Sequence, residues 1–263
     1  MNVPIRMLGI ATSIFWILLV GFIASAAYSL KDLNFSIGEP QFTTTSNRDM
    51  ALSLPLYIYN GGFYGLKGFN LTTLFSDANG TEVSRSSTFV STIPHGQNTT
   101  ILHNVTLNMD KLAESDEQYL FNDANLNAEV TAGLNFAELL PVQLSTNFTF
   151  PWGAPLYDLT LGQPRFRNPT RTSTAITVPI SFENHAAFDL NGTVHANLYD
   201  KDGTLLAESE KLLDVSKGSE YAGNFDFAVP LSTVSQSSMT GGRVEVSFST
   251  SMFEYGPVVK SIG

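Results

Sequence analysis

The sequence predicts an all-β protein in which two tandem fibronectin-like or immunoglobulin-like β-sandwiches follow one N-terminal transmembrane α-helix. Three observations lead to this fold class. The motif at residues 37–42 (IGEPQF) returns at residues 161–166 as LGQPRF. Short stretches of alternating apolar and polar residues, separated by turn signals, follow each copy. An uncharged apolar run at residues 7–30 precedes both copies.

Internal repetition defines the expected domains. Three further pairs of segments match in the same order: residues 54–60 with 178–184, 77–81 with 200–204, and 138–142 with 254–258. Four ordered matches indicate two copies of one domain rather than a long array. The predicted parts are a membrane anchor at 1–31, a first sandwich at 32–151, a linker at 152–156 and a second sandwich at 157–263.

Composition narrows the classes of protein. A chain of 263 residues with 43% hydrophobic content can form two ordinary domain cores. The net charge of −10 disfavours binding to nucleic acid and to anionic lipid surfaces. With no cysteine, the chain has no disulfide, no thiolate metal site and no cysteine nucleophile.

The apolar run at residues 7–30 is the predicted membrane anchor. Its 24 residues extend about 36 Å as a helix, against a hydrocarbon core of about 30 Å. A cleaved signal peptide is the alternative, because Ala24-Ser25-Ala26 resembles a cleavage site. Arg6 before the run favours a cytoplasmic N-terminus, which places residues 32–263 outside the cytoplasm as a single-pass cell-membrane protein.

In the first copy, one strand is marked by alternation of Leu52, Leu54, Leu56 and Ile58. Pro55 within it indicates an unpaired backbone amide, at a sheet edge or a bulge. Asn79-Gly80 predicts a hairpin turn. Residues 110–119 form the one soluble stretch with helical character, with Asp110 as its expected cap.

The second copy repeats this pattern. Ile176, Val178, Ile180 and Phe182 alternate along the matching strand, and Asp202-Gly203 predicts the matching hairpin. The inward positions are large in both copies, which favours filled cores over a ligand cavity.

The order of these parts resembles the type 2 late-embryogenesis-abundant family, the LEA14-like or WHy (water-stress and hypersensitive-response) domain. The residues that carry the resemblance are the inward strands ending at Asn60 and Asn184 and the hairpins at residues 77–80 and 200–203. Tandem copies behind one membrane helix look like proteins common in archaeal genomes. The resemblance implies a non-catalytic, fibronectin-like domain linked to stress protection, with no catalytic residues to carry over.

Candidate chemistry is sparse. Asp200 and Asp202 have part of a calcium-loop pattern, but a hairpin turn explains them without a metal. The four histidines, His95, His103, His185 and His195, lack zinc-ligand spacing and are expected to be solvated. The repeated Glu138 and Glu254 favour a structural role in a turn. We therefore expect no enzyme activity and no catalytic, cofactor or metal site.

Asn-x-Ser/Thr sequons are the one enriched signal, and all of them follow the apolar run. They predict N-glycosylation on an outer surface. The sequons begin at Asn34, Asn70, Asn79, Asn98, Asn104, Asn147 and Asn191.

These observations favour a membrane-anchored, extracytoplasmic structural or interaction protein. Its expected partners are membrane lipid along residues 7–30 and another membrane or surface protein, or a second copy of itself. Strand edges at Pro55 and Pro179 and the small residues of the helix motivate the protein partner. The alternatives are a module that binds an apolar ligand or lipid inside a sandwich, and a secreted protective protein after signal-peptide cleavage.

Overall fold

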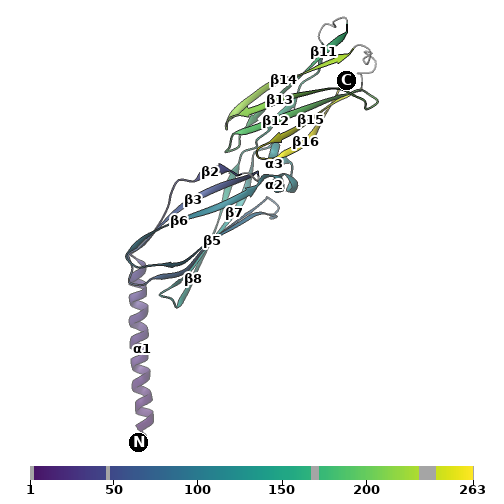
Figure 1. The fold of residues 1–263 in the computed structure, drawn as a ribbon. Coiled ribbons are helices and arrows are strands. Elements are labelled where there is room, and N and C mark those ends of the chain that lie inside the picture. Colours follow the sequence, from purple (N-terminus) through teal and green to yellow (C-terminus); the bar gives the residue numbers. More distant parts are fainter. Residues whose placement is uncertain (1–2, 46–47, 167–171, 231–240, 263) are drawn as a thin grey trace.

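The computed structural model describes residues 3–45, 48–166, 172–230 and 241–262. It is all-β apart from an N-terminal helix and two short helices, which confirms the predicted fold class. Figure 1 shows the N-terminal helix, the first sandwich and the second sandwich following one another along the length of the molecule. Helix α1 (Val3–Leu30) is long and apolar enough over Thr12–Leu30 to cross a membrane.

The first sandwich consists of two antiparallel sheets. One sheet contains β1 (Leu33–Ile37), β2 (Gln41–Thr44), β3 (Asp49–Asn60) and β6 (Gln97–Asn108). The other contains β5 (Glu82–Ile93), β4 (Leu66–Ser76), β7 (Ala124–Phe136) and β8 (Leu140–Trp152), in that order across the sheet.

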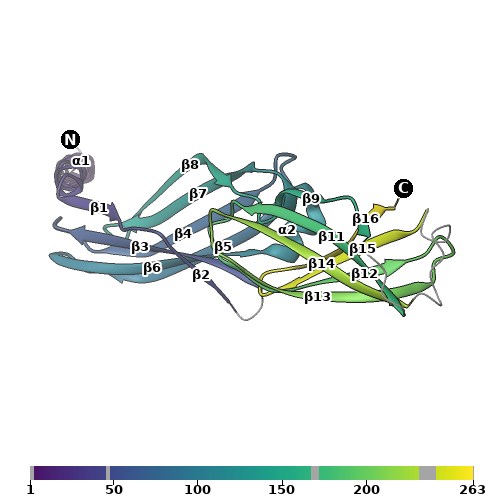
Figure 2. The ribbon, with the colours of Figure 1, turned by 90° about the horizontal axis from the view of Figure 1, so that it is seen from above.

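The second sandwich has the same topology, strand for strand. Its first sheet contains β9 (Tyr157–Leu161), β10 (Arg165–Phe166), β11 (Ser173–Asn184) and β14 (Ser219–Pro230). Its second contains β13 (Leu205–Val215), β12 (Leu190–Tyr199), β15 (Arg243–Thr250) and β16 (Glu254–Ser261). The sequence repeat is therefore a repeat of structure, and Figure 2 shows both sandwiches from above.

Two repeated prolines lie in central strands, so their prediction as sheet edges is wrong. Strand β3 pairs with β6 on one side and with β1 and β2 on the other. Pro55 lies where β1 gives way to β2, and its carbonyl accepts the Gly38 N–H at 2.8 Å. Pro179 repeats this with Gly162, also at 2.8 Å. The missing amide is tolerated because the partner strand is interrupted there.

Repeated polar residues hold equivalent turns in both copies. The Asn60 side chain donates to the carbonyls of Tyr64 and Ile93, and Asn184 donates to those of Phe188 and Val215. These bonds satisfy carbonyls of the following loop and the neighbouring turn, which fixes both.

The predicted hairpins are also present. Asp77 accepts the N–H groups of Asn79 and Thr81, and Asp200 accepts those of Asp202 and Thr204. The aspartates are thus turn residues, as the hairpin interpretation requires.

The helical segment of the first copy is divided into α2 (Met109–Ser115) and α3 (Gln118–Phe121). Asn108 caps α2 by accepting the Lys111 N–H at 2.8 Å, so the prediction of Asp110 as the cap is wrong by two positions. Asp110 instead lies in the first turn, where a negative charge interacts favourably with the helix dipole.

The predicted linker is buried between the sandwiches. Trp152 donates its indole N–H to the Tyr119 carbonyl, and the Leu156 N–H donates to the Leu120 carbonyl. Ala154 and Leu156 are fully buried. One hydrophobic cluster extends from the half of the first sandwich that is distal to α1 into the second sandwich. Residues 152–156 therefore belong to a packed junction rather than to an exposed tether.

Candidate functional site

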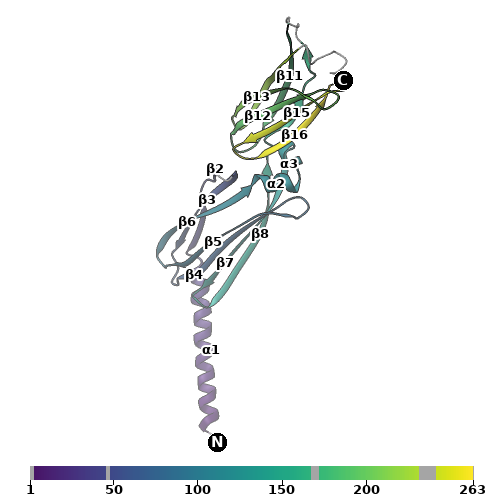
Figure 3. The ribbon, with the colours of Figure 1, turned by 45° about the vertical axis from the view of Figure 1, so that its right-hand side comes forward.

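The main candidate site is an apolar groove between the two sheets of the first sandwich. Two cavities of about 430 Å³ each lie between these sheets and share Ile37, Leu56 and Leu71 in their walls. Figure 3 shows the sheet that contains β3 and β6 lying opposite the sheet that contains β7 and β8. We call the two cavities together the apolar groove. The prediction of a filled core is therefore wrong for the first sandwich.

The groove is lined by carbon-rich side chains along most of its length. The lower cavity is the one nearer α1. It is lined by Leu30, Leu33, Phe35, Ser36, Ile37, Leu56, Ile58, Phe69, Leu71, Ala132, Leu134, Val142 and Leu144. Its upper cavity adds Pro40, Phe42, Leu52, Leu54, Thr73, Phe75, His103, Val105, Val130, Thr146, Phe148 and Phe150. On β8 the lining extends from Val142 to Phe150, roughly 26 Å of extended strand.

In the second sandwich, the matching strand is buried between the two sheets. Ile176, Val178 and Ile180 on β11 are buried, whereas the matching Leu52, Leu54 and Leu56 on β3 are only half-buried. The open side lies between β1 and β8. There Ile37 is 67% exposed and Leu144 is 70% exposed. Large apolar side chains thus line a space that protein atoms leave unfilled.

A polar bridge crosses the interior beside the upper cavity. His103 on β6 lies with Nε2 2.9 Å from Thr73 Oγ1 on β4 and Nδ1 2.8 Å from Thr88 Oγ1 on β5. His103 is 1% exposed, and burial lowers its pKa. The neutral ring therefore joins the two sheets by hydrogen bonds. The expectation that His103 is solvated is wrong.

The lower end of the groove reaches the membrane helix. Leu30, the last residue of α1, and Leu33, the first of β1, both line it. Ala26 of α1 belongs to the hydrophobic cluster at this end of the sandwich, and Ile58 and Phe69 of that cluster also line the lower cavity. The groove therefore begins where the predicted membrane span ends.

The remaining predicted site residues lie apart from the groove interior. All seven sequon asparagines are solvent-exposed, so their glycosylation remains a prediction that the fold accommodates. Glu138 and Glu254 form surface ion pairs with Lys67 and Arg48, respectively. Within the described part of the chain, no three His, Asp or Glu side chains are grouped to hold a metal.

The other histidines are surface groups with separate roles. His195 lies 3.4 Å from Glu210 on the neighbouring strand. His185 lies at the junction, with Nδ1 2.8 Å from Asp123 and Nε2 2.9 Å from Glu183. Hydrogen bonds to Asp123 and then to Glu183 raise the pKa of His185. Its contact with Asp123 links the second sandwich to the segment after α3.

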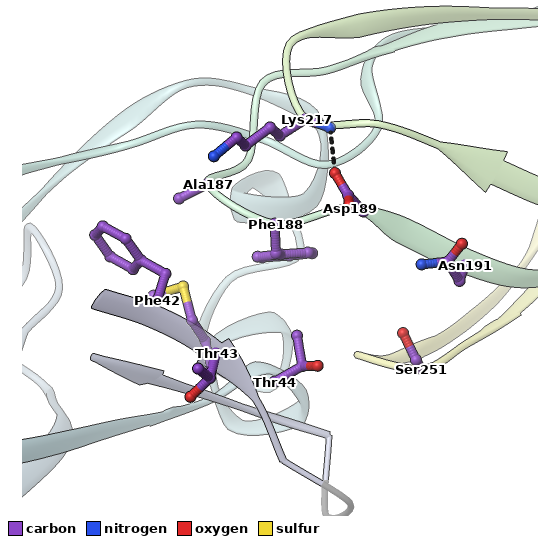
Figure 4. Close-up of a pocket in the computed structure, with 10 residues that line it drawn as sticks. Phe42, Thr43, Thr44, Ala187, Phe188, Asp189, Asn191, Lys217 and Ser251 are labelled. Carbon is purple, nitrogen blue, oxygen red and sulfur yellow. Dashed lines mark hydrogen bonds between the residues drawn. The ribbon is translucent and has the colours of Figure 1, made fainter. Parts of the chain in front are cut away.

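A second pocket lies at the junction, between β2 and the second sandwich (Figure 4). It has a volume of about 450 Å³ and a mixed lining that includes Phe42, Thr44 and Asn191. The Asp189 carboxylate accepts the Lys217 backbone N–H at 2.9 Å, so that carboxylate already serves the fold. The apolar groove is the more distinctive site, because its large side chains are exposed along one continuous surface.

Comparison with known proteins gives no family. No family model matches the chain, and no curated protein sequence matches it. Among solved structures, a red sea bream transglutaminase matches with 17% identity and a TM-score of 0.30, over 88% of this chain and 31% of its own. A glycosyl hydrolase family 2 member from Bacteroides cellulosilyticus matches with 10% identity and a TM-score of 0.32, over 81% of this chain and 28% of its own.

A β-glucuronidase from glycoside hydrolase family 2 matches at a similar level, with 14% identity and a TM-score of 0.33, over 81% of this chain and 24% of its own. The chain spans less than a third of the length of each of these proteins. Matches this weak carry no inference about activity. The resemblance to type 2 late-embryogenesis-abundant domains stays a prediction made from the repeated motifs.

Proposed function

We propose that the protein is a membrane-tethered binding protein that holds a long hydrocarbon chain in the apolar groove of its first sandwich. The observation that carries this proposal is the groove itself: two adjoining cavities of about 430 Å³ each, lined almost wholly by aliphatic and aromatic side chains. Pockets of this size and character are typical of small-molecule sites. In this proposal the second sandwich is a closed, non-catalytic partner domain outside the cytoplasm.

Energetics favour a long chain as the occupant. Each buried methylene contributes about 0.8 kcal/mol, so ten contribute on the order of 8 kcal/mol. Loss of free motion on binding costs about 4–15 kcal/mol, which a short chain does not offset. The groove extends roughly 26 Å along β8, whereas one leaflet of a bilayer core is about 15 Å thick. It therefore has room for a complete lipid chain.

One observation that favoured a protein partner is contradicted by the structure. That alternative rested partly on Pro55 and Pro179 as exposed strand edges, and both residues lie in central strands. A hydrocarbon chain needs no strand edge. It also accounts for Phe35, Ile37 and Leu144, which otherwise expose large apolar surfaces without a role.

The decisive test is Leu144→Asp, which places a carboxylate in the groove wall. Leu144 is 70% exposed, so we expect the variant to fold. The matched control is Leu212→Asp, at an 80% exposed position of the second sandwich. Full-length proteins in micelles are irradiated with a photoactivatable phosphatidylcholine or fatty acid, and mass spectrometry maps the adducts.

We expect adducts on β3 and β8 peptides of the wild type and of Leu212→Asp, and at least about tenfold fewer with Leu144→Asp, because a charge beside the chain is costly. Equal yields for both variants, or adducts confined to α1, would overturn the proposal. Phosphatidylcholine and fatty acid distinguish a membrane lipid from a free amphiphile as the preferred ligand.

A further inference from the structure

The loop between β3 and β4, residues 61–65 (GGFYG), packs directly against the last turns of α1. The Tyr64 hydroxyl lies 2.6 Å from Ser25 Oγ, and the Phe63 N–H donates to Ser29 Oγ at 2.8 Å. Tyr64 also makes an edge contact with Phe22, with 5.9 Å between ring centroids. Ser29 is 1% exposed. The sandwich is therefore fastened to the helix by its side as well as by the chain connection.

These contacts fix the depth of the loop. Ser25 precedes Leu30 by five residues, or about 7.5 Å along the helix axis. The uncharged run of residues 7–30 is about 36 Å long, so with the run centred only about 3 Å extends beyond each side of a core of about 30 Å. Ser25 then lies inside the hydrocarbon boundary, and Tyr64 shares its depth.

The surface chemistry of this end of the sandwich fits such a position. Phe63 is 61% exposed and stacks on Tyr28 with ring centroids 5.9 Å apart, while Lys31 Nζ lies over the Tyr28 ring. Tyrosine and other amphipathic aromatic residues concentrate at membrane interfaces, and a flanking lysine extends toward the headgroups. The loop at residues 61–65 itself contains no charged residue.

The turn between β7 and β8 provides a second apolar tip. Leu139 in this turn is 74% exposed. Figures 1 and 3 show the turn reaching down beside the upper turns of α1. The Lys67–Glu138 ion pair flanks this tip, where headgroups would solvate it. The lower cavity of the groove lies next to this second tip and to the end of α1, since Leu134 and Val142 on either side of the turn and Leu30 line it.

We infer that the Phe63–Tyr64 loop and the Leu139 turn are inserted in the bilayer interface beside α1, so that the apolar groove opens onto the surrounding leaflet. A lipid of that leaflet then supplies the chain, which moves into the groove without crossing water. This last step rests on the proposed function, whereas the insertion of the two tips does not.

Insertion is tested by spin labels, for which the absence of cysteine leaves no background reactivity. Phe63→Cys, Leu139→Cys and the control Leu212→Cys are labelled in full-length protein in phosphatidylcholine nanodiscs. Collision with oxygen and with a water-soluble nickel complex then reports depth. We expect membrane depth at positions 63 and 139 and full water exposure at 212. Water exposure at either 63 or 139 equal to that at 212 would overturn the insertion.

The route of the chain is tested with Leu139→Asp and, as control, Leu212→Asp. We expect groove adducts from photoactivatable phosphatidylcholine in nanodiscs to fall about tenfold for Leu139→Asp, because a charged carboxylate at this position opposes insertion of the turn. Adduct yield in micelles should stay within about twofold. Unchanged yield in nanodiscs would overturn the route. Failure of the proposed function itself appears differently, as no groove adducts in the wild type.

Discussion

At the scale of single residues, the two copies share their turns and differ in their interiors. His103 pairs across β6 and β3 with Leu54, and the matching position opposite Val178 is Phe225. Thr73 lies four residues before the hairpin Asp77, as Ala196 lies four before Asp200. The first sandwich thus has a histidine–threonine bridge where the second has a buried phenylalanine and alanine. A hydrogen-bonded bridge fixes the sheets at a set separation, whereas apolar side chains pack them together.

The bridge makes the first sandwich sensitive to acid. Burial lowers the pKa of His103, so the unfolded chain binds its proton more readily than the folded chain does. The stabilisation by neutral His103 is present above about pH 6.5 and is lost as the pH falls through the lowered folded pKa. We expect His103→Phe to lower the stability by about 1–3 kcal/mol at pH 7.5, because Thr73 and Thr88 lose a partner.

Between pH 6.5 and pH 5, however, the melting temperature of the wild type should fall by more than that of His103→Phe. Thermal unfolding of both proteins at the two pH values measures this difference. The matched control for loss of a histidine is His195→Phe, at an exposed position of the second sandwich. Parallel pH curves for the wild type and His103→Phe would contradict a neutral, buried His103.

At the scale of elements, the sequence predicted features that depend on neighbours along the chain. It did not predict features that depend on pairing between distant strands. Alternation predicted the strands, and Asn79-Gly80 and Asp202-Gly203 predicted the hairpins, because both signals depend on neighbours along the chain. The central position of β3 and β11 depends on how β1 with β2, and β9 with β10, share one partner strand. Nothing in the local pattern around Pro55 or Pro179 distinguishes such an interruption from an edge.

The junction between the sandwiches shows the same limit. Pro151, Gly153 and Pro155 are typical of an exposed linker, yet the segment is buried. Ala154 accepts the His185 N–H and donates to Asp123, while Tyr255 donates to Glu117 across the junction. Burial and the hydrogen bond to Glu117 raise the pKa of Tyr255 to about 12, so it remains a donor at neutral pH.

Gly153 is the critical position of the junction. A Cβ atom added there would collide with the backbone carbonyl of His185. We expect Gly153→Ala to destabilise the protein by about 1–3 kcal/mol, the usual cost of overpacking, and to expose the junction to protease. The control is Gly133→Ala in β7, where the nearest atom to an added Cβ lies at 3.9 Å. Equal melting temperatures and digestion rates would mean that the sandwiches are not packed together in solution.

At the scale of the whole molecule, the boundary between the two hydrophobic clusters does not coincide with the boundary between the two sequence repeats. One hydrophobic cluster joins the second sandwich to the distal half of the first, and another joins the proximal half to Ala26 of α1. Residues of both clusters line the apolar groove. The sequence predicted two copies and a helix, but it could not predict this division. Inward-pointing Leu54 and Leu56 look alike whether their sheets close or stand apart.

The contacts of α1 bear on the choice between a retained anchor and a cleaved signal peptide. Cleavage after Ala26 would remove Phe22 and Ser25, which contact Tyr64. We therefore expect a retained helix whose last turns belong to the folded unit. N-terminal sequencing of the purified protein should give a start at or near Met1, and a start at or near Ala27 would contradict retention.

The same contacts determine what a topology experiment should show. With the sandwich fastened to α1, we expect residues 32–263 to lie on one side of the membrane, and Arg6 favours the outer side. Protease added to intact cells that express the full chain should digest both sandwiches and leave α1 protected. Mass spectrometry of the same material should find glycans on exposed sequons such as Asn70 and Asn191 where the host glycosylates. Protection of both sandwiches until the cells are lysed would contradict this orientation.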